Sequence, residues 1–211
     1  MAGSSAAGAA AGRLRLLGLG AALMASLSVP GVARATTYYV ASSGSDSASG
    51  TSPSSPWRTL LAVDGHRFAP GDSVLLRCGS SFSGPLRPQA SGTPSAPVRF
   101  DAYGSCSGSS RPLVVDGGSA GIDVEGLSWV TFANLAISGH AGSGGDAIHL
   151  GGGSHLTFDH ILAQGDTTGV RNDSSSTTTA VLISNSRFVG TGAAGVGIEN
   201  TSTTSTAWTV A

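Results

Sequence analysis

The sequence predicts an all-β protein that winds into a right-handed parallel β-helix. Three similar segments, 130–139, 156–165 and 181–190, recur with their closing glycines at nearly equal intervals. A shorter apolar alternation precedes each of them. A period in the twenties, built from short alternating strands and glycine turns, is typical of a solenoid. No stretch between the strands is long enough for a helix, which argues against a doubly wound α/β sheet.

The repeats predict ladders of equivalent side chains. Each coil is too small to bury its own apolar face, so the coils should stack with parallel strands about 4.8 Å apart. The crossover rule favours right-handed winding. One apolar ladder is expected to contain Phe132, Phe158 and Ile183. A polar ladder at a turn, where side chains can satisfy backbone groups, is expected to contain Asn134, His160 and Asn185. We therefore interpret His160 as structural.

Residues 1–35 are predicted to be a signal peptide. Arg13 and Arg15 form a basic start, the apolar run 16–29 follows, and residues 33–35 supply the small-x-small pattern that signal peptidase accepts. The run is shorter than the about 20 residues that a transmembrane helix needs. An uncleaved membrane anchor is the alternative. We expect a secreted protein with no membrane contact after cleavage.

The rest of the chain is expected to form one domain in two parts. Residues 36–118 should contain the N-terminal cap and the first coils, and residues 119–211 the regular coils. A short helix over 56–63, with Ser55 as its N-cap, should cover the end of the first coil so that its core stays dry. The sequence ends at Ala211 in mid-coil without a C-terminal cap, so we interpret it as truncated or partial.

The composition excludes some functions. Charged residues make up 11% of the chain, the formal net charge is −1, and no basic stripe offers an electrostatic footprint for nucleic acid. We expect a monomer. Cys78 and Cys106 are predicted to form a disulfide, because an even pair in an oxidising compartment is more often bonded than free. Two solitary buried thiols are the alternative.

Three motifs in the N-terminal part carry a family resemblance. They are Tyr38-Tyr-Val-Ala-Ser-Ser-Gly-Ser-Asp46, Gly50-Thr-Ser-Pro-Ser-Ser-Pro-Trp57 and Pro70-Gly-Asp-Ser-Val74. In this order, and together with the repeats, they make residues 38–200 similar to pectate-lyase-like β-helix proteins. The resemblance implies a polysaccharide as partner and a carbohydrate-active function, since members include polysaccharide lyases, glycoside hydrolases and epimerases. The alternatives are a non-catalytic glycan-binding or cell-surface solenoid, or an inactive fragment.

A polar stripe along one face of the short strands is the candidate site. In these strands polar residues alternate with apolar ones, and the period of two points them outward. The stripe comprises Asp123, Glu125, His149, Arg171, Asp173 and Glu199. In β-helix enzymes the glycan groove usually runs along such a face, so Asp123 and His149 are candidates for binding substrate. An ordinary solvated surface is the alternative.

A hydrolase would draw on pairs of carboxylates in this stripe. Retaining and inverting glycosidases need them about 5 Å and about 6.5–9.5 Å apart, respectively. Asp173 and Glu199 are expected in one column on adjacent coils. Glu125 and Asp173 are expected about two strand spacings apart. The three are therefore the candidate catalytic acids.

A lyase would instead need a base and a cation. Proteins that this chain resembles use lysine or arginine as base, often with Ca²⁺ bound by aspartates. Lysine is absent from the sequence, which leaves Arg171 as the candidate base, a difficult role for a group with a pKa above 12. We expect no cofactor and no metal site; a Ca²⁺ ion would draw on Asp123, Glu125 and Asp173.

Overall fold

The chain was analysed as a computed structural model. It describes residues 1, 3, 34–106, 110–115, 120–139, 145–173, 175, 177–190, 196–200 and 206–211. The predicted signal peptide, residues 1–35, lies almost entirely outside the described residues. The chain from Ala33 to Ala211 forms one compact unit. Among the described residues, no helix has the length and apolar character needed to cross a membrane.

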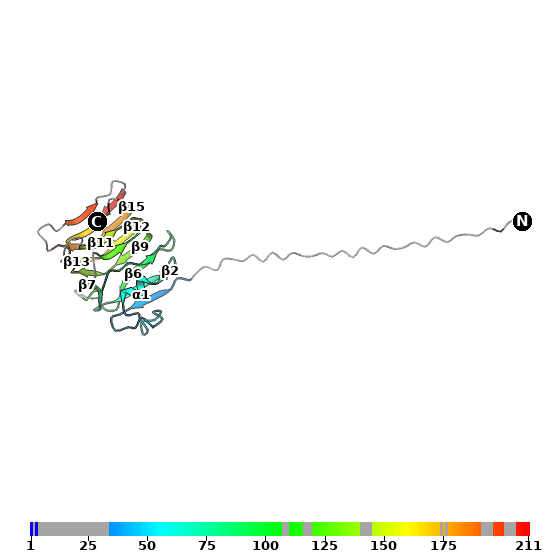
Figure 1. Cartoon of the computed structure of the whole chain (residues 1–211), viewed down its shortest axis with the longest axis horizontal. Coiled ribbons are helices and arrows are strands. Elements are labelled where there is room, and N and C mark those ends of the chain that lie inside the picture. Colours follow the sequence, from blue (N-terminus) through cyan, green and yellow to red (C-terminus); the bar gives the residue numbers. More distant parts are fainter. Residues whose placement is uncertain are drawn as a thin grey trace. The chain divides into compact units, whose positions relative to one another are not determined.

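The described strands form three large parallel sheets, and each full coil gives one strand to each of them (Figure 1). The seven-stranded sheet has the order β1 (Thr37–Val40), β3 (Ser73–Arg77), β6 (Val98–Tyr103), β9 (Leu127–Ala133), β12 (Gly153–Asp159), β15 (Thr178–Ser184) and β18 (Thr206–Val210). The five-stranded sheet has the order β16 (Arg187–Val189), β13 (Leu162–Gln164), β10 (Ala136–Ser138), β7 (Leu113–Val115) and β4 (Ser81–Ser83). The four-stranded sheet has the order β17 (Val196–Asn200), β14 (Thr168–Asn172), β11 (Asp146–Leu150) and β8 (Ala120–Val124). A small sheet pairs β2 (Arg67–Phe68) with β5 (Gln89–Ala90).

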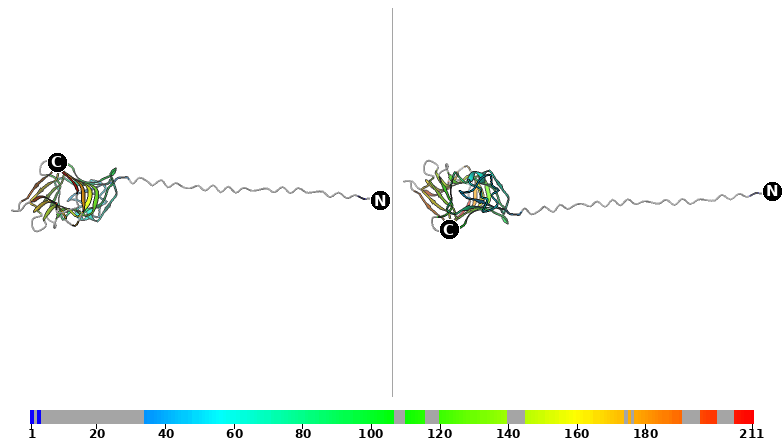
Figure 2. Two further views of the ribbon diagram at one scale, coloured as in Figure 1. Left: turned by 90° about the horizontal axis from the view of Figure 1, so that it is seen from above. Right: turned by 90° about the horizontal axis from the view of Figure 1, so that it is seen from below.

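This topology is a parallel β-solenoid of about four turns, so the fold predicted from the repeats is confirmed. In the views turned by 90°, successive coils superpose around a common interior (Figure 2). Phe100, Phe132 and Phe158 stack in that interior, with ring centroids 5.1 and 5.3 Å apart and planes tilted by 15° and 5°. Ile183 pairs in register with Phe158 and is buried. The predicted apolar ladder is confirmed, and Phe100 extends it by one coil.

Each repeated segment is two strands joined at a left-handed corner. The corner residues Asn134, His160 and Asn185 have φ of 57°, 54° and 50°. Asparagine is one of the few residues that visits this conformation readily, because its short polar side chain can bond locally. At two of these corners the side chains bond Asp159: its Oδ2 lies 2.8 Å from His160 Nδ1, and its Oδ1 accepts a 2.9 Å hydrogen bond from Asn185 Nδ2. The turn ladder therefore holds adjacent coils together.

The capping helix is shorter than predicted and begins later. α1 (Leu60–Asp64) has Thr59 as its N-cap, so the prediction of Ser55 is wrong. Trp57 forms a parallel bridge with Val40, which keeps the backbone extended up to the helix. Leu60 is buried against the end of the apolar core, as a cap requires.

The disulfide between Cys78 and Cys106 is present. The two cysteines follow β3 and β6, which pair in register, so the bond ties neighbouring coils near the N-terminal end. Closing a chain segment of this length stabilises a fold by about 3 kcal/mol in the chain-entropy account.

The coils differ in length, yet their columns stay aligned. In the four-stranded sheet Asp146 pairs with Ala120 of the preceding coil and with Thr168 of the following coil. Fewer residues separate Asp146 from Thr168 than separate Ala120 from Asp146. In the five-stranded sheet Ala136 pairs with Leu162, a step as long as that from Ala120 to Asp146. The shortening therefore falls between β13 and β14, at one corner of the coil.

Candidate functional site

The candidate site lies on the outer face of the four-stranded sheet. Its inward positions Ile122, Ile148 and Val170 are fully buried, as the alternation predicts. The residues between them form a first column, in which consecutive strands bring together Asp123, His149, Arg171 and Glu199.

A second column runs beside the first, one step past the strand ends. The Gly151 N–H donates to the Val124 carbonyl (2.7 Å), and the Asp173 N–H donates to the Leu150 carbonyl (3.1 Å). These bonds continue the parallel ladder by one residue. They bring Glu125, Gly151 and Asp173 into one column, so Glu125 and Asp173 are two strand spacings apart, as predicted.

The predicted column of Asp173 and Glu199 is wrong. Glu199 pairs with Arg171, two residues away from the expected register. Because side chains alternate with a period of two, a slip of two residues leaves each one on its predicted face, and the sequence pattern cannot detect it. The side chain of Glu199 lies outside the described ones.

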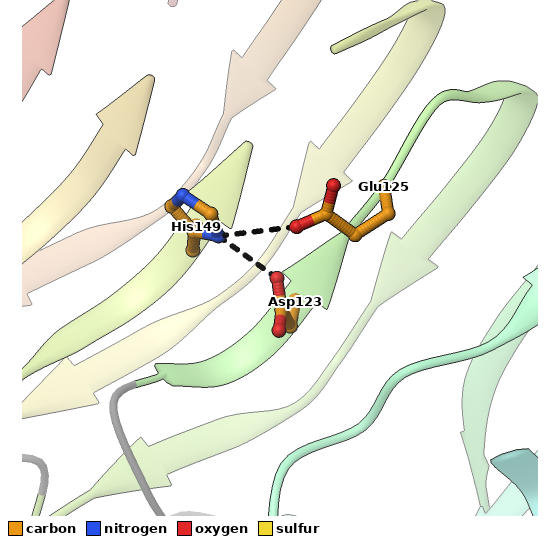
Figure 3. A group of neighbouring side chains, drawn as sticks. All are labelled: Asp123, Glu125 and His149. Carbon is orange, nitrogen blue, oxygen red and sulfur yellow. Dashed lines mark hydrogen bonds and ion pairs between the residues drawn. The ribbon is translucent and has the colours of Figure 1, made fainter. Parts of the chain in front are cut away.

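His149 connects the two columns (Figure 3). Its Nδ1 lies 2.8 Å from Asp123 Oδ1 and 3.9 Å from Glu125 Oε1, and its Nε2 lies 3.0 Å from Asp173 Oδ2. Burial alone would lower the pKa of His149, but the hydrogen bonds and charges of Asp123 and Asp173 outweigh burial and raise it above its ordinary value. The carboxylates therefore favour the imidazolium form of the ring.

Asp123 is more buried than an outward position predicts, at 8% exposed. Its Oδ2 accepts a 2.7 Å hydrogen bond from Arg87 Nε, while its Oδ1 faces His149. Arg87 is itself held by Asp64, whose Oδ1 accepts a 2.8 Å hydrogen bond from the backbone N–H of Arg87. Burial raises the pKa of Asp64 to about 6, against the lowering effect of Arg87. Sequence reasoning missed Arg87 and Asp64, because both reach the site from the irregular N-terminal part and no repeat marks them.

A groove of about 650 Å³ lies beside this network. It is lined by Arg67, Phe68, Arg87, Pro88, Gln89, Ala90, Ser91, Asp123, Glu125 and Leu127. Glu125 reaches into it with a side chain that is 67% exposed, whereas Asp173, at 43%, lies on the far side of His149. The groove thus combines apolar walls with arginines and carboxylates.

Arg171 belongs to the first column, but its guanidinium is engaged elsewhere. Its Nη2 lies 2.6 Å from Oδ2 of Asp146, which is 1% exposed. Burial raises the pKa of Asp146, and the positive charge of Arg171 opposes that shift. Removing a proton from Arg171 would leave a buried carboxylate without its cation, so this contact disfavours a role as base.

Asp123, Glu125 and His149 have donor atoms within 4.8 Å of one another, close enough to share a metal ion. The set does not suit Ca²⁺, which takes six to eight oxygen ligands. Both Asp123 oxygens already bond cationic partners, and an imidazolium must lose a proton before it binds metal.

Comparisons with known proteins give fold neighbours. No family model matches the chain, and no curated protein does either. A GH136 lacto-N-biosidase from Eubacterium ramulus has a similar structure, with a TM-score of 0.60 and 20% identity over 76% of this chain and 36% of that enzyme. A selenomethionine structure of that enzyme gives 0.61 and 20% over 74% and 34%. A rhamnogalacturonan lyase has a TM-score of 0.48 and 16% identity over 77% of this chain and 45% of the lyase.

The chain therefore spans about a third of the length of the lacto-N-biosidase. Identity at this level is evidence for the fold alone. Together with the strand order, it confirms the architecture that the resemblance implied: the chain is a parallel β-helix.

Proposed function

We propose that this protein is a secreted, carbohydrate-active β-helix protein that hydrolyses glycosidic bonds of a polysaccharide held in the groove. One observation carries the proposal: Glu125 and Asp173 stand in one column on either side of Gly151, with the His149 ring between their carboxylates. Glu125 lines the groove, and a pair of carboxylates is the usual equipment of glycoside hydrolases.

The separation of the two carboxyl groups, rather than of their backbones, decides between retention and inversion. Two strand spacings separate the backbones of Glu125 and Asp173 by about 9.6 Å. The carboxylates lean toward each other but contact opposite nitrogens of one imidazole, at 3.9 and 3.0 Å. Inverting glycosidases hold their carboxyl groups about 6.5–9.5 Å apart, and retaining ones about 5 Å apart. His149 would act as a positioning residue that contacts both groups.

Elimination fits the site less well than hydrolysis. A lyase needs a base beside the uronate, the sequence contains no lysine, and Arg171 is bound to a buried aspartate. Export of the protein is part of the proposal as well. It is supported by the disulfide, which persists in oxidising compartments, and by the apolar segment at the N-terminus.

The test is a degradation assay with the full chain on neutral and uronate polysaccharides. New reducing ends without unsaturated products are expected, and proton NMR of the anomer formed first distinguishes retention from inversion. Glu125→Gln and Asp173→Asn should each lower kcat/KM by at least about 100-fold with an unchanged thermal midpoint. Asp101→Asn, a matched change on the seven-stranded sheet, should have no such effect.

Glycan binding without cleavage is the second candidate. It is favoured by the closed network in which Asp123 and His149 satisfy each other without a ligand, as a structural cluster would. In that case the protein would bind polysaccharide but release no products, and Glu125→Gln would leave turnover at the background rate. Ultraviolet absorbance from unsaturated uronates would overturn the proposed hydrolysis in favour of a lyase.

A further inference from the structure

A second feature of the surface lies on the seven-stranded sheet, at a different corner of the coil. Trp129, His155 and Ala180 occupy equivalent positions on consecutive coils, each between paired residues of β9, β12 and β15. All three have left-handed backbones, with φ of 58°, 53° and 51°. They form a third ladder, which we call the aromatic corner.

The aromatic corner holds a stack of two rings that ends at the third position. The Trp129 and His155 rings lie 3.7 Å apart at their centroids, with planes tilted by only 14°. The next coil offers only the methyl group of Ala180. The face of His155 that points away from Trp129 therefore meets no ring from that coil, and His155 is exposed.

A groove of about 270 Å³ runs beside the stack and reaches Ala180, the place of the missing third ring. It is lined by Pro94, Pro97, Trp129, Thr131, His155, Thr157 and Ala180. Thr131 and Thr157 pair in register and place hydroxyls along one side. Rings and prolines with a few placed hydroxyls match the usual make-up of a site for a small organic ligand. The segment that carries Pro94 and Pro97 also gives Ser91 to the 650 Å³ groove, so the two grooves adjoin opposite parts of one loop.

The left-handed backbone at the corner recurs from coil to coil and does not itself favour an aromatic residue. A bulky residue with positive φ is uncommon, and such a conformation costs of order 1–3 kcal/mol. In the turn ladder that conformation is taken by Asn134 and Asn185, whose side chains tolerate it. Tryptophan has no such local compensation from its side chain, so Trp129 is not the residue that the backbone alone would select. Strain of this kind clusters at ligand sites.

We propose that the aromatic corner binds one sugar ring of a glycan, stacked on His155 above Ala180 as the third member of the ladder. The apolar face of a pyranose would pack on the imidazole, and its hydroxyls would reach Thr157. The choice of a sugar rests on the proposed function, but the site shares no residue with the groove that holds Glu125. It would give the protein a second point of attachment to the same polymer.

The experiment follows the His155 imidazole by NMR while hexasaccharides of β-1,4-glucan, β-1,4-galactan and polygalacturonate are added in turn. At least one should shift the His155 ring resonances, and its own pyranose protons should move upfield because they lie over the imidazole, in the wild type and equally in Glu125→Gln. His155→Ala and Ala180→Trp should weaken binding at the corner at least tenfold, the second by filling the place of the sugar. His155→Phe should retain binding because it keeps a stacking face.

The two proposals fail separately. Product release with unmoved His155 resonances at millimolar glycan would overturn the aromatic corner and leave hydrolysis intact. Shifts of His155 without any products would support the corner and count against hydrolysis. Equal affinity of the wild type and of a folded His155→Ala variant, judged by circular dichroism and thermal midpoint, would also overturn the corner. Thr157→Val provides a milder variant in which folding is not in question, and its affinity should fall several-fold.

Discussion

The carboxylate of Glu125 occupies the space that a side chain on Gly151 would need. A Cβ built on Gly151 would overlap both carboxylate oxygens of Glu125. Gly151 is the middle residue of the column that carries Glu125 and Asp173, so its missing side chain is what lets the Glu125 carboxylate lean toward His149. The arrangement of the proposed catalytic pair thus depends on a residue with no functional group of its own.

Gly151→Ala is expected to displace Glu125 and lower kcat/KM by about 100-fold, since a misplacement of about 1 Å can cost that much. Its φ lies outside the left-handed region, so alanine fits the backbone and the free energy of unfolding should change by less than about 1 kcal/mol. Gly197→Ala, on β17 of the same sheet where an added Cβ meets nothing, is the control. Unchanged kinetics in Gly151→Ala would show that the position of Glu125 is unimportant.

His149 is expected to titrate above its ordinary value of about 6.5 in an NMR titration of the imidazole. A raised pKa in the folded state means that its stabilising contribution is complete below the unfolded value and disappears as the pH rises through the folded value. Asp173→Asn removes one of the two facing charges and should lower the pKa of His149. A pKa at or below 6.5 in the wild type would contradict the bridged arrangement.

Asp64 gives a pH dependence over a more acidic range. Its pKa is about 6 in the fold against an ordinary value of 3.8, so the folded state holds the proton more tightly. The free energy of unfolding should therefore decrease as the pH rises from about 4 to about 6. Asp64→Asn can still accept the Arg87 N–H and should abolish that part of the slope. Urea denaturation across the range measures it, and identical slopes in the two proteins would refute the assignment.

Phe132→Ala should destabilise the solenoid more than any surface change. Phe132 is fully buried between two other phenylalanine rings, and such truncations cost about 3–5 kcal/mol. Leu61→Ala, at a side chain that is 78% exposed, should change the free energy of unfolding by less than about 0.5 kcal/mol. Chemical denaturation of both variants gives the comparison. A loss below about 1 kcal/mol for Phe132→Ala would mean that the ladder contributes little.

The sequence predicted the fold well because the coil is built from local patterns. Alternation places Ile148 inward and His149 outward without knowledge of any distant contact. The recurrence of phenylalanine at one position of the repeat predicts the central stack. The sequence predicted a turn at Asn134 and Asn185. It did not predict that this turn divides each repeated segment into two strands of different sheets, since apolar residues flank the turn on both sides.

The candidate site was predictable only in part. Glu125 and Asp173 could be placed on one face and two coils apart, because both steps involve well-marked repeats. The predicted pairing of Glu199 was wrong because a slip of two residues keeps the alternation of inward and outward side chains. The burial of Asp123 could not be foreseen, since it depends on Arg87 folding over it from another part of the chain. The stack of Trp129 on His155 also depends on the left-handed backbone at the corner. No residue type in the sequence indicated that conformation.

The unequal coils have an architectural consequence. The connection from β10 to β11 is longer than that from β13 to β14, while the columns on both sides remain in register. That corner therefore tolerates changes of length, and it lies at the opposite end of β11 and β14 from Gly151 and Asp173. Loops can be exchanged there, in evolution or by grafting, and the surface at this corner can thus change in each coil separately. The proposed catalytic carboxylates keep their spacing in the process.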